Sequence, residues 1–193
     1  MATKRGRTSL KASVFLVPRW GWMAIVAGDE GVVRILLPTG KGEAERFVKG
    51  LGAELTEGEP ALEEAKGQIL EYFAGRRHIF NLGLDWRGLS EFSRRALEAC
   101  AQIPFGEVRS YRWVAERAGF PMAPRAIGRA LASNPFPLVI PCHRVIKADG
   151  SLGGFSGPGG TALKRRLLQF EREVVGRWQR GGAPPERQRE VSP

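Results

Sequence analysis

The stretch from residue 124 to residue 147 reads PRAIGRALASNPFPLVIPCHRVIK. It opens with a short helical run of small residues that ends at Asn134-Pro135, because a proline cannot continue a helix. It then places Cys142 and His143 side by side, after a proline that fixes the backbone and before an arginine. The chain contains only two cysteines and two histidines, so this adjacent pair in a rigid, basic setting requires an explanation.

Charge is distributed unevenly along the 193 residues, whose formal net charge is +10. Residues 12–100 carry 11 basic and 13 acidic side chains, whereas residues 101–150 carry 7 basic and 3 acidic ones. A basic second half is typical of a protein that faces a polyanion. A solvated surface with basic tails explains the same pattern, and charge alone does not decide between the two.

The cysteines and the hydropathy exclude several classes of protein. Two cysteines cannot form a disulfide framework. Cys100, Cys142, His78 and His143 lack the paired spacing of a zinc site, so we expect no metal and no cofactor. The first apolar run, residues 14–17, is too short for a signal peptide, and no stretch reaches transmembrane length. We expect a soluble intracellular protein.

The first half of the chain reads as a small α/β domain. Three apolar runs rich in β-branched residues predict a β-meander, at residues 14–17, 22–27 and 32–37. Helical spacing of apolar residues predicts a helix over 61–73, and 79–84 is interpreted as another strand. His78, beside two arginines, is interpreted as a surface residue. The predicted domains are residues 1–89, residues 90–176 and a basic, disordered tail over 177–193.

From Ser90 onward the pattern is of helices and loops. Ser90 is a candidate helix cap, and Cys100 lies on the apolar side of the helix that follows, where we interpret it as a buried thiol without function. Segments 110–119 and 123–132 have the appearance of a helix-turn-helix. The glycine-rich loop SLGGFSGPGG at 151–160 indicates close approach of backbone to another group, but it lacks the spacing of a phosphate-binding loop.

The Cys–His pair fits a nucleophile. The thiolate is the reactive form of cysteine, and an unperturbed thiol with a pKa of about 8.5 is mostly protonated at neutral pH. A neighbouring histidine, a positive environment and a helix N-terminus would each lower the pKa of Cys142. A cysteine that is merely buried accounts for the same residue equally well, and its chemistry alone leaves both interpretations open.

Four segments, taken together, narrow this choice: IPFGEVRSY at 103–111, PRAIGRALASNPFPLVIPCHRVI at 124–146, GGFSG at 153–157 and KRRLLQFE at 164–171. They closely resemble the O6-alkylguanine-DNA alkyltransferase family, the methylated-DNA–protein-cysteine methyltransferases, with the greatest specificity around IPCHRV. The resemblance implies an α/β N-terminal domain, an RNase-H-like β-sheet with helices. It also implies a mainly α C-terminal domain with a winged helix-turn-helix-like DNA-binding element.

The resemblance implies a role for each residue of the site. Cys142 would accept the alkyl group from O6-alkylguanine in DNA, and O4-alkylthymine is left open as a second substrate. His143 would take the thiol proton through a water, and Glu171 would orient that histidine, although by itself Glu171 reads as an exposed helix residue. Tyr111 would donate a proton or a hydrogen bond to the departing guanine. Asn134 would bind the backbone beside the cysteine and link the recognition helix to the active site. Four further residues would line the base pocket: Val145, Phe155, Ser156 and Gly157.

The same resemblance implies how the protein binds double-stranded DNA. Arg125 would fill the gap left by a flipped nucleotide, and its helix, with small residues such as Ala126 and Gly128, would enter the minor groove. Arg129 stands where many members have a small residue, and Phe155 where several have tyrosine. The thioether product is stable to water, so each molecule would act once. We expect a monomer in the cytoplasm, associated with the nucleoid when on DNA, or in the nucleus of a eukaryote.

Four rival interpretations explain less of the sequence. A fused damage sensor of the adaptive-response kind would need an added cysteine-rich zinc module, which two cysteines cannot supply. Non-catalytic lesion-binding relatives lack the acceptor cysteine, which Cys142 supplies. A sequence-specific helix-turn-helix regulator would need neither the Cys–His pair nor the glycine-rich loop. A thiol protease would use a distant histidine rather than an adjacent one. The sequence therefore favours a DNA repair protein that transfers an alkyl group to its own cysteine.

Overall fold

The computed structural model describes residues 9–181. The chain divides into two compact units, and the first comprises residues up to 67 together with 82–85. The second comprises residues 68–81 and 86–181 of the described chain. Residues 68–81 thus belong to the second unit, although residues 82–85 of the first unit follow them in the sequence.

The first unit is built on a four-stranded sheet with the order β3-β2-β1-β4. The strands are β1 (Lys11–Val17), β2 (Gly21–Gly28), β3 (Gly31–Thr39) and β4 (Glu54–Leu55). β1 and β3 each pair antiparallel with β2, so the predicted meander is confirmed. β4 adds to the sheet parallel to β1, which makes the sheet mixed.

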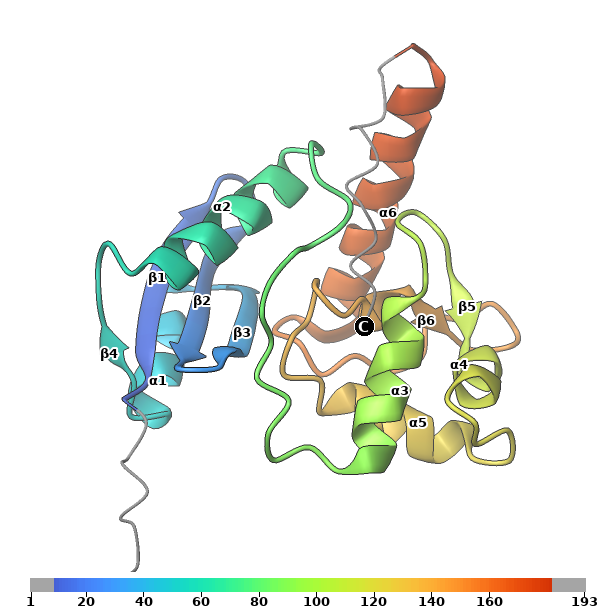
Figure 1. Ribbon diagram of the computed structural model, residues 1–193. Coiled ribbons are helices and arrows are strands. Elements are labelled where there is room, and N and C mark those ends of the chain that lie inside the picture. The colour runs from blue at the N-terminus through green and yellow to red at the C-terminus, as the bar shows by residue number, and fades with distance from the viewer. Residues whose placement is uncertain (1–8, 182–193) are drawn as a thin grey trace, which may run out of the picture. The chain divides into compact units, whose positions relative to one another are not determined.

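Helix α1 (Lys41–Gly50) covers one face of this sheet. Its Ala44 and Val48 pack against Ala12, Ala24 and Val26 in a cluster whose members are at most 2% exposed. The small side chains allow the helix backbone to approach the strands closely. Helix α2 (Pro60–Phe73) begins in the first unit and, in Figure 1, its first turns cross β1 and β2.

Two interpretations of the segment after α2 are wrong. Residues 79–84 form no strand; within the described chain their pairing is a single bridge between Leu84 and Val32, and the Val32 N–H donates to the Gly83 carbonyl over 2.8 Å. His78 is not a simple surface residue, because its Nδ1 is buried without a hydrogen-bond partner in the described chain. Its ring centroid lies 5.6 Å from that of Trp178.

The second unit is mainly helical (Figure 1). Its helices are the end of α2, then α3 (Glu91–Ala101), α4 (Tyr111–Arg117), α5 (Pro124–Ala132), the 3₁₀ helix η1 (Cys142–Arg144) and α6 (Gly160–Gln179). β5 (Arg109–Ser110) pairs parallel with β6 (Val145–Ile146). Ser90 caps α3 as predicted, because its Oγ accepts a hydrogen bond from the Ser93 N–H over 3.2 Å. Cys100 is 0% exposed, also as predicted.

Helix α6 extends further than the sequence indicated. It continues to Gln179, beyond Arg177 where the tail was expected to begin. The remainder of the expected tail, from residue 182 onward, lies outside the described residues. Within residues 9–181, no helix combines the length and apolarity needed to cross a membrane. The same residues contain no group of three or more His, Cys, Asp or Glu side chains that could hold a metal ion.

Gly31 offers a test of the first unit's packing. It has a φ of +122°, and a Cβ there would lie 2.4 Å from the carbonyl oxygen of Gly83. We expect Gly31→Ala to lower the free energy of unfolding by about 3 kcal/mol, from backbone strain and steric overlap together. Gly58 also has a positive φ, +73°, but a Cβ added there would point into open space, so Gly58→Ala should cost only about 1 kcal/mol. Equal losses in denaturant unfolding would contradict the steric argument.

Candidate active site

Asn134 connects the end of α5 to the segment that carries the cysteine. Its Oδ1 accepts a hydrogen bond from the Phe136 N–H, and its Nδ2 donates to the Ile140 carbonyl, both over 2.9 Å. The Cys142 N–H donates to that same carbonyl over 2.9 Å. Residues between the two are therefore held in a fixed loop, and Cys142 follows it as the first residue of η1.

Cys142 is only 9% exposed. Burial raises the pKa of its thiol above the ordinary value, although the Asn134 side chain and the charge of Lys164 act in the opposite direction. The sequence-based expectation of a lowered pKa is thus wrong in its net direction, because the neighbours of a residue in the sequence do not reveal how far burial disfavours a charge. The thiol is protonated at rest, and a base must take its proton during reaction.

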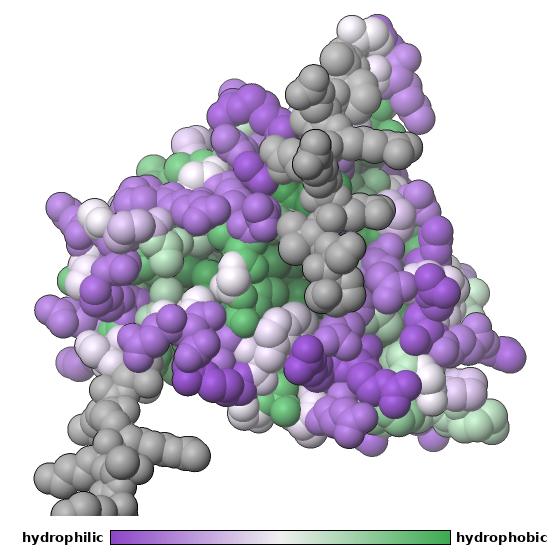
Figure 2. Space-filling model, in the orientation of Figure 1, coloured by the Kyte–Doolittle hydropathy of each residue, from purple (hydrophilic) through white to green (hydrophobic). Residues whose placement is uncertain are grey.

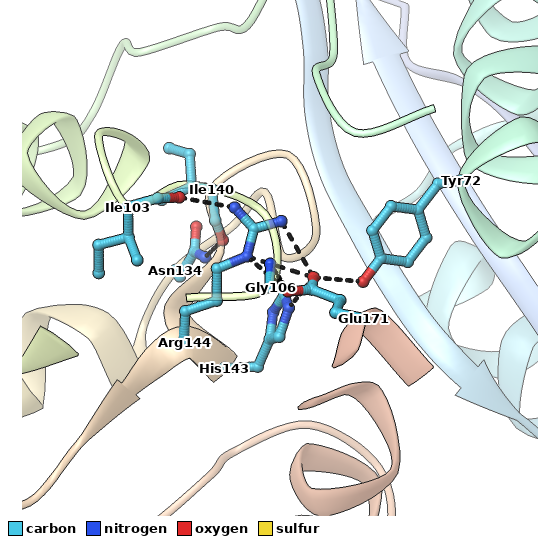
Figure 3. Close-up of polar contacts among 8 residues, drawn as sticks. All are labelled: Tyr72, Ile103, Gly106, Asn134, Ile140, His143, Arg144 and Glu171. Atoms are coloured by element: carbon cyan, nitrogen blue, oxygen red, sulfur yellow. Dashed lines mark hydrogen bonds and ion pairs between the residues drawn. The ribbon is translucent and has the colours of Figure 1, made fainter. Parts of the chain in front are cut away.

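A candidate for that base, His143, is the next residue in the chain. His143 Nε2 is 2.8 Å from Glu171 Oε1, and both side chains are buried (Figure 3). Burial lowers the pKa of His143, an effect that Glu171 partly opposes, so the imidazole is neutral near pH 7. A neutral imidazole facing a carboxylate with Nε2 donates its proton there. The lone pair is then on Nδ1, which is free to accept a proton.

The Glu171 carboxylate receives hydrogen bonds from three further residues (Figure 3). Arg144 Nε donates to Oε1 over 3.2 Å and to Oε2 over 3.0 Å, and its Nη2 donates to Oε1 over 3.0 Å. The Gly106 N–H donates to Oε2 over 3.0 Å, and the Tyr72 hydroxyl to Oε1 over 2.7 Å. Burial would raise the pKa of Glu171, but His143 and Arg144 outweigh it and hold that pKa well below its usual range. Glu171 stays ionised and orients the histidine.

Sequence reasoning missed Arg144, Tyr72 and Lys164. Arg144 stands inside the quoted motif, but nothing in its position reveals that it is 4% exposed and also donates to the Ile103 carbonyl over 2.7 Å. Tyr72 lies three residues after the buried Ile69 on the predicted helix, and a tyrosine on an apolar face calls for a partner for its hydroxyl. The need for such a partner was the signal in the sequence that could have identified Tyr72.

Lys164 is the third missed residue. It is 0% exposed, and its Nζ donates to the Val145 carbonyl over 2.5 Å and lies 5.9 Å from the centroid of the Tyr111 ring. Burial lowers its pKa from 10.5 to about 8, with Cys142 and Cys100 acting in the opposite direction. Its spacing from Leu167, Leu168 and Glu171 places all four on one side of α6, which a charged residue rarely occupies.

Tyr111 lies where the helical pair meets the glycine-rich loop. A Cβ on Gly153 would lie 3.1 Å from its hydroxyl, and one on Gly128 would lie 3.6 Å from its ring. Burial raises the pKa of Tyr111, and Cys142 adds to this, so its hydroxyl remains a donor. Ser156 Oγ donates to the Ala132 carbonyl over 2.6 Å, which joins the loop to the end of α5. The structure therefore brings α4, α5 and this loop together.

The two arginines of α5 do not join the buried cluster. Arg125 and Arg129 are exposed, whereas Ile127, Ala130 and Leu131 of the same helix are buried. Ala126 and Gly128 are partly exposed. The part of the surface over α3, α4 and α5 that faces the viewer in Figure 2 is largely hydrophilic. Helix α5 thus presents small and cationic side chains to solvent, an arrangement suited to close approach of a polyanion.

Comparisons with known proteins agree with this chemistry. A family described as "6-O-methylguanine DNA methyltransferase, DNA binding domain" matches residues 91–173. A methylated-DNA–protein-cysteine methyltransferase from Methanothermobacter thermautotrophicus is 39% identical over 152 residues, covering 77% of this chain and 78% of the relative. One from Mycolicibacterium paratuberculosis is 48% identical over 117 residues, covering 61% of this chain and 69% of the relative.

Solved structures give the same result. The Mycobacterium tuberculosis O6-methylguanine methyltransferase is similar with a TM-score of 0.71 and 32% identity, over 86% of this chain and 94% of that one. A structure of Mycobacterium tuberculosis OGT in complex with DNA is similar with a TM-score of 0.70 and 33% identity, over 85% of this chain and 94% of that one.

The burial of Lys164 leads to a prediction for how the free energy of unfolding depends on pH. Below pH 8 it is charged in both the folded and the unfolded chain, and the cost of its burial is present in full. As the pH rises from about 8 toward 10.5, the folded protein has released a proton that the unfolded chain still holds, so folding becomes more favourable. Lys164→Met removes this contribution. Relative to the variant, wild type should gain about 3 kcal/mol of unfolding free energy between pH 7.5 and pH 10.5.

Denaturant unfolding at a series of pH values measures this difference. Lys147→Met is the matched control, because it removes an exposed lysine. Parallel stability curves for wild type and Lys164→Met would mean that the amine is not desolvated as its position indicates.

Proposed function

The chain belongs to the family of methylated-DNA–protein-cysteine methyltransferases, and from this premise we propose that Cys142 is its alkyl acceptor. The protein repairs DNA by direct transfer of the alkyl group to its own cysteine, in a single turnover. The observation that carries the assignment to Cys142 is its place directly before His143, whose Nε2 is fixed by the ionised Glu171 over 2.8 Å.

The proposed mechanism begins from a protonated thiol. As the Cys142 sulfur attacks the alkyl carbon, His143 Nδ1 takes the thiol proton through a bridging water. The new carbon–sulfur bond replaces the bond from that carbon to guanine O6, and the guanine leaves as an anion that the Tyr111 hydroxyl stabilises by donating a hydrogen bond or its proton. Glu171 keeps the imidazole in position without taking the proton, and Lys164 lowers the cost of negative charge on the sulfur. The thioether is not hydrolysed by water, so the protein is consumed.

We propose that the substrate is O6-alkylguanine held outside the duplex stack. The reacting atom is inaccessible within stacked DNA, so the nucleotide must be flipped out. Tyr111 then hydrogen-bonds the departing guanine, and Val145, Phe155, Ser156 and Gly157 line its pocket. The close contact of Gly153 with the Tyr111 hydroxyl, 3.1 Å from a Cβ position, supports this arrangement because a side chain there would obstruct the phenol. O4-alkylthymine is a second candidate substrate for the same pocket.

We further propose that α5 enters the minor groove, with Arg125 filling the space of the flipped nucleotide and Arg129 contacting phosphate. Exposed cations on a helix of small residues support this proposal. In this proposal, α4 and α5 form the helix-turn-helix and the strands β5 and β6 belong to its wing, while the first unit is RNase-H-like. Residues 90–176 hold the DNA-binding and acceptor functions. The protein acts as a monomer in the cytoplasm, or in the nucleus of a eukaryote.

The acceptor assignment predicts a single modification. Incubation with duplex DNA containing O6-methylguanine should add one methyl group per protein molecule, and peptide mass spectrometry should place it on Cys142. Cys100→Ala should still be methylated, because Cys100 is 0% exposed and has no adjacent base. Sustained turnover, or transfer by Cys142→Ala, would overturn the assignment.

The role of Arg125 predicts a dependence on substrate form. Unstacking and unpairing a base costs a few kcal/mol, and a side chain in the gap offsets part of that cost. Arg125→Ala should therefore slow repair of duplex DNA by roughly tenfold or more, single-stranded DNA less, and the free base O6-methylguanine hardly at all. Arg125→Lys should recover only part of the duplex rate, because lysine lacks the planar guanidinium.

Arg129→Ala is the matched control on the same helix. It should weaken DNA binding and reduce its salt dependence, without changing the ratio of duplex rate to free-base rate at saturating DNA. If Arg125→Ala slows the free base as much as the duplex, Arg125 supports the pocket and does not replace a flipped nucleotide.

A further inference from the structure

Among the donors to Glu171, Tyr72 comes from a part of the chain not assigned to the reaction. It lies on α2, outside the region 91–173 that matches the family's DNA-binding domain. We propose that Tyr72 is a positioning residue of the alkyl transfer, whose hydroxyl fixes Glu171 Oε1 and limits how strongly the carboxylate attracts a proton on His143. This inference rests on the proposed function of the His143–Glu171 pair.

The surroundings of Tyr72 make it a fixed donor. It is 0% exposed, and its ring centroid lies 5.1 Å from that of Phe73, 5.8 Å from that of Phe105 and 5.6 Å from that of Phe170. Burial raises the pKa of Tyr72 well above its ordinary value, and Glu171 raises it further. The phenol therefore keeps its proton and directs it to Glu171 Oε1 over 2.7 Å.

Tyr72 and His143 share one oxygen atom. Oε1 accepts from Tyr72 over 2.7 Å, from His143 over 2.8 Å and from Arg144 Nη2 over 3.0 Å. Each donor stabilises part of the negative charge of that oxygen. Without the tyrosine hydroxyl, more of this charge acts on His143, which favours the imidazolium. Because His143 and Arg144 still donate to Oε1, the loss of the hydroxyl does not leave the carboxylate oxygen unpaired.

The direction of the effect follows from the groups that face His143. Glu171 of α6 and Tyr72 of α2 act through the carboxylate, Lys164 of α6 and Arg144 of η1 disfavour a charged imidazole, and Cys142 is the proton donor. Tyr72→Phe removes the hydroxyl alone and keeps the ring. It should raise the pKa of His143, so that the histidine is protonated, and unable to accept the thiol proton, at a higher pH than in wild type.

The chain allows this to be measured directly, because it contains only two histidines. Titration of the imidazole C–H resonances by NMR should show that Tyr72→Phe raises the pKa of His143 above its value in wild type. His78 serves as an internal reference, since none of the described hydrogen bonds joins it to Tyr72 or Glu171. In single-turnover assays with O6-methylguanine duplex DNA, the rate of Tyr72→Phe relative to wild type should fall severalfold at the pH values where the titration shows His143 protonated in the variant but not in wild type. The two rates should agree within about twofold at higher pH, where His143 is neutral in both proteins, and DNA affinity should not change.

Phe73→Leu is the matched control, because it alters the packing around the Tyr72 ring and retains the hydroxyl. It should lower stability without moving the titration of His143. A Tyr72→Phe titration that coincides with wild type, or a rate loss equal at all pH values, would show that Tyr72 only packs the core. If wild type transfers no alkyl group, the proposed function fails, yet the NMR titration still tests the connection from Tyr72 to His143.

Discussion

The negative charge of a carboxylate without access to water must be stabilised by donors inside the protein. In this molecule the residues around Glu171 are arranged to meet that requirement. The carboxylate is 0% exposed and gathers donors from α2, from the turn at Gly106, and from both His143 and Arg144 of η1. An unpaired buried charge costs several kcal/mol. Formation of the second unit and alignment of the histidine are therefore the same event, because the contacts that satisfy Glu171 also orient His143.

The thiol illustrates a balance between protection and reactivity. A cysteine with a lowered pKa reacts with any accessible electrophile or oxidant, whereas burial keeps Cys142 protonated. In the proposed reaction, Asn134 fixes the position of the cysteine, Lys164 supplies a nearby positive charge and His143 accepts the proton. In this proposal the sulfur loses its proton only when a substrate is held in line with it, so its reactivity depends on the geometry of the bound base.

The features predictable from the sequence were those encoded by neighbours along the chain. The meander followed from β-branched runs between turn residues, the start of α3 from Ser90, and the Cys–His pair from adjacency. The strand predicted over residues 79–84 was wrong because apolar residues also occur in irregular segments. Tyr72 and Lys164 were missed because packing, rather than proximity in the sequence, determines their partners. Tyr72 and Glu171, for example, are 99 residues apart. The pKa of Cys142 was misjudged because burial is a property of the fold.

The contrast between the two cysteines has a consequence for a cell that relies on this protein. Cys100 is 0% exposed, and Cys142 is the thiol with a base beside it. The number of lesions that can be removed then equals the number of intact molecules present. Repair with this stoichiometry has a fixed limit. When lesions are fewer than intact protein molecules, almost all of them are repaired, and any lesions in excess are repaired only after new protein has been synthesised. Expression level, rather than catalytic speed, sets tolerance to alkylation.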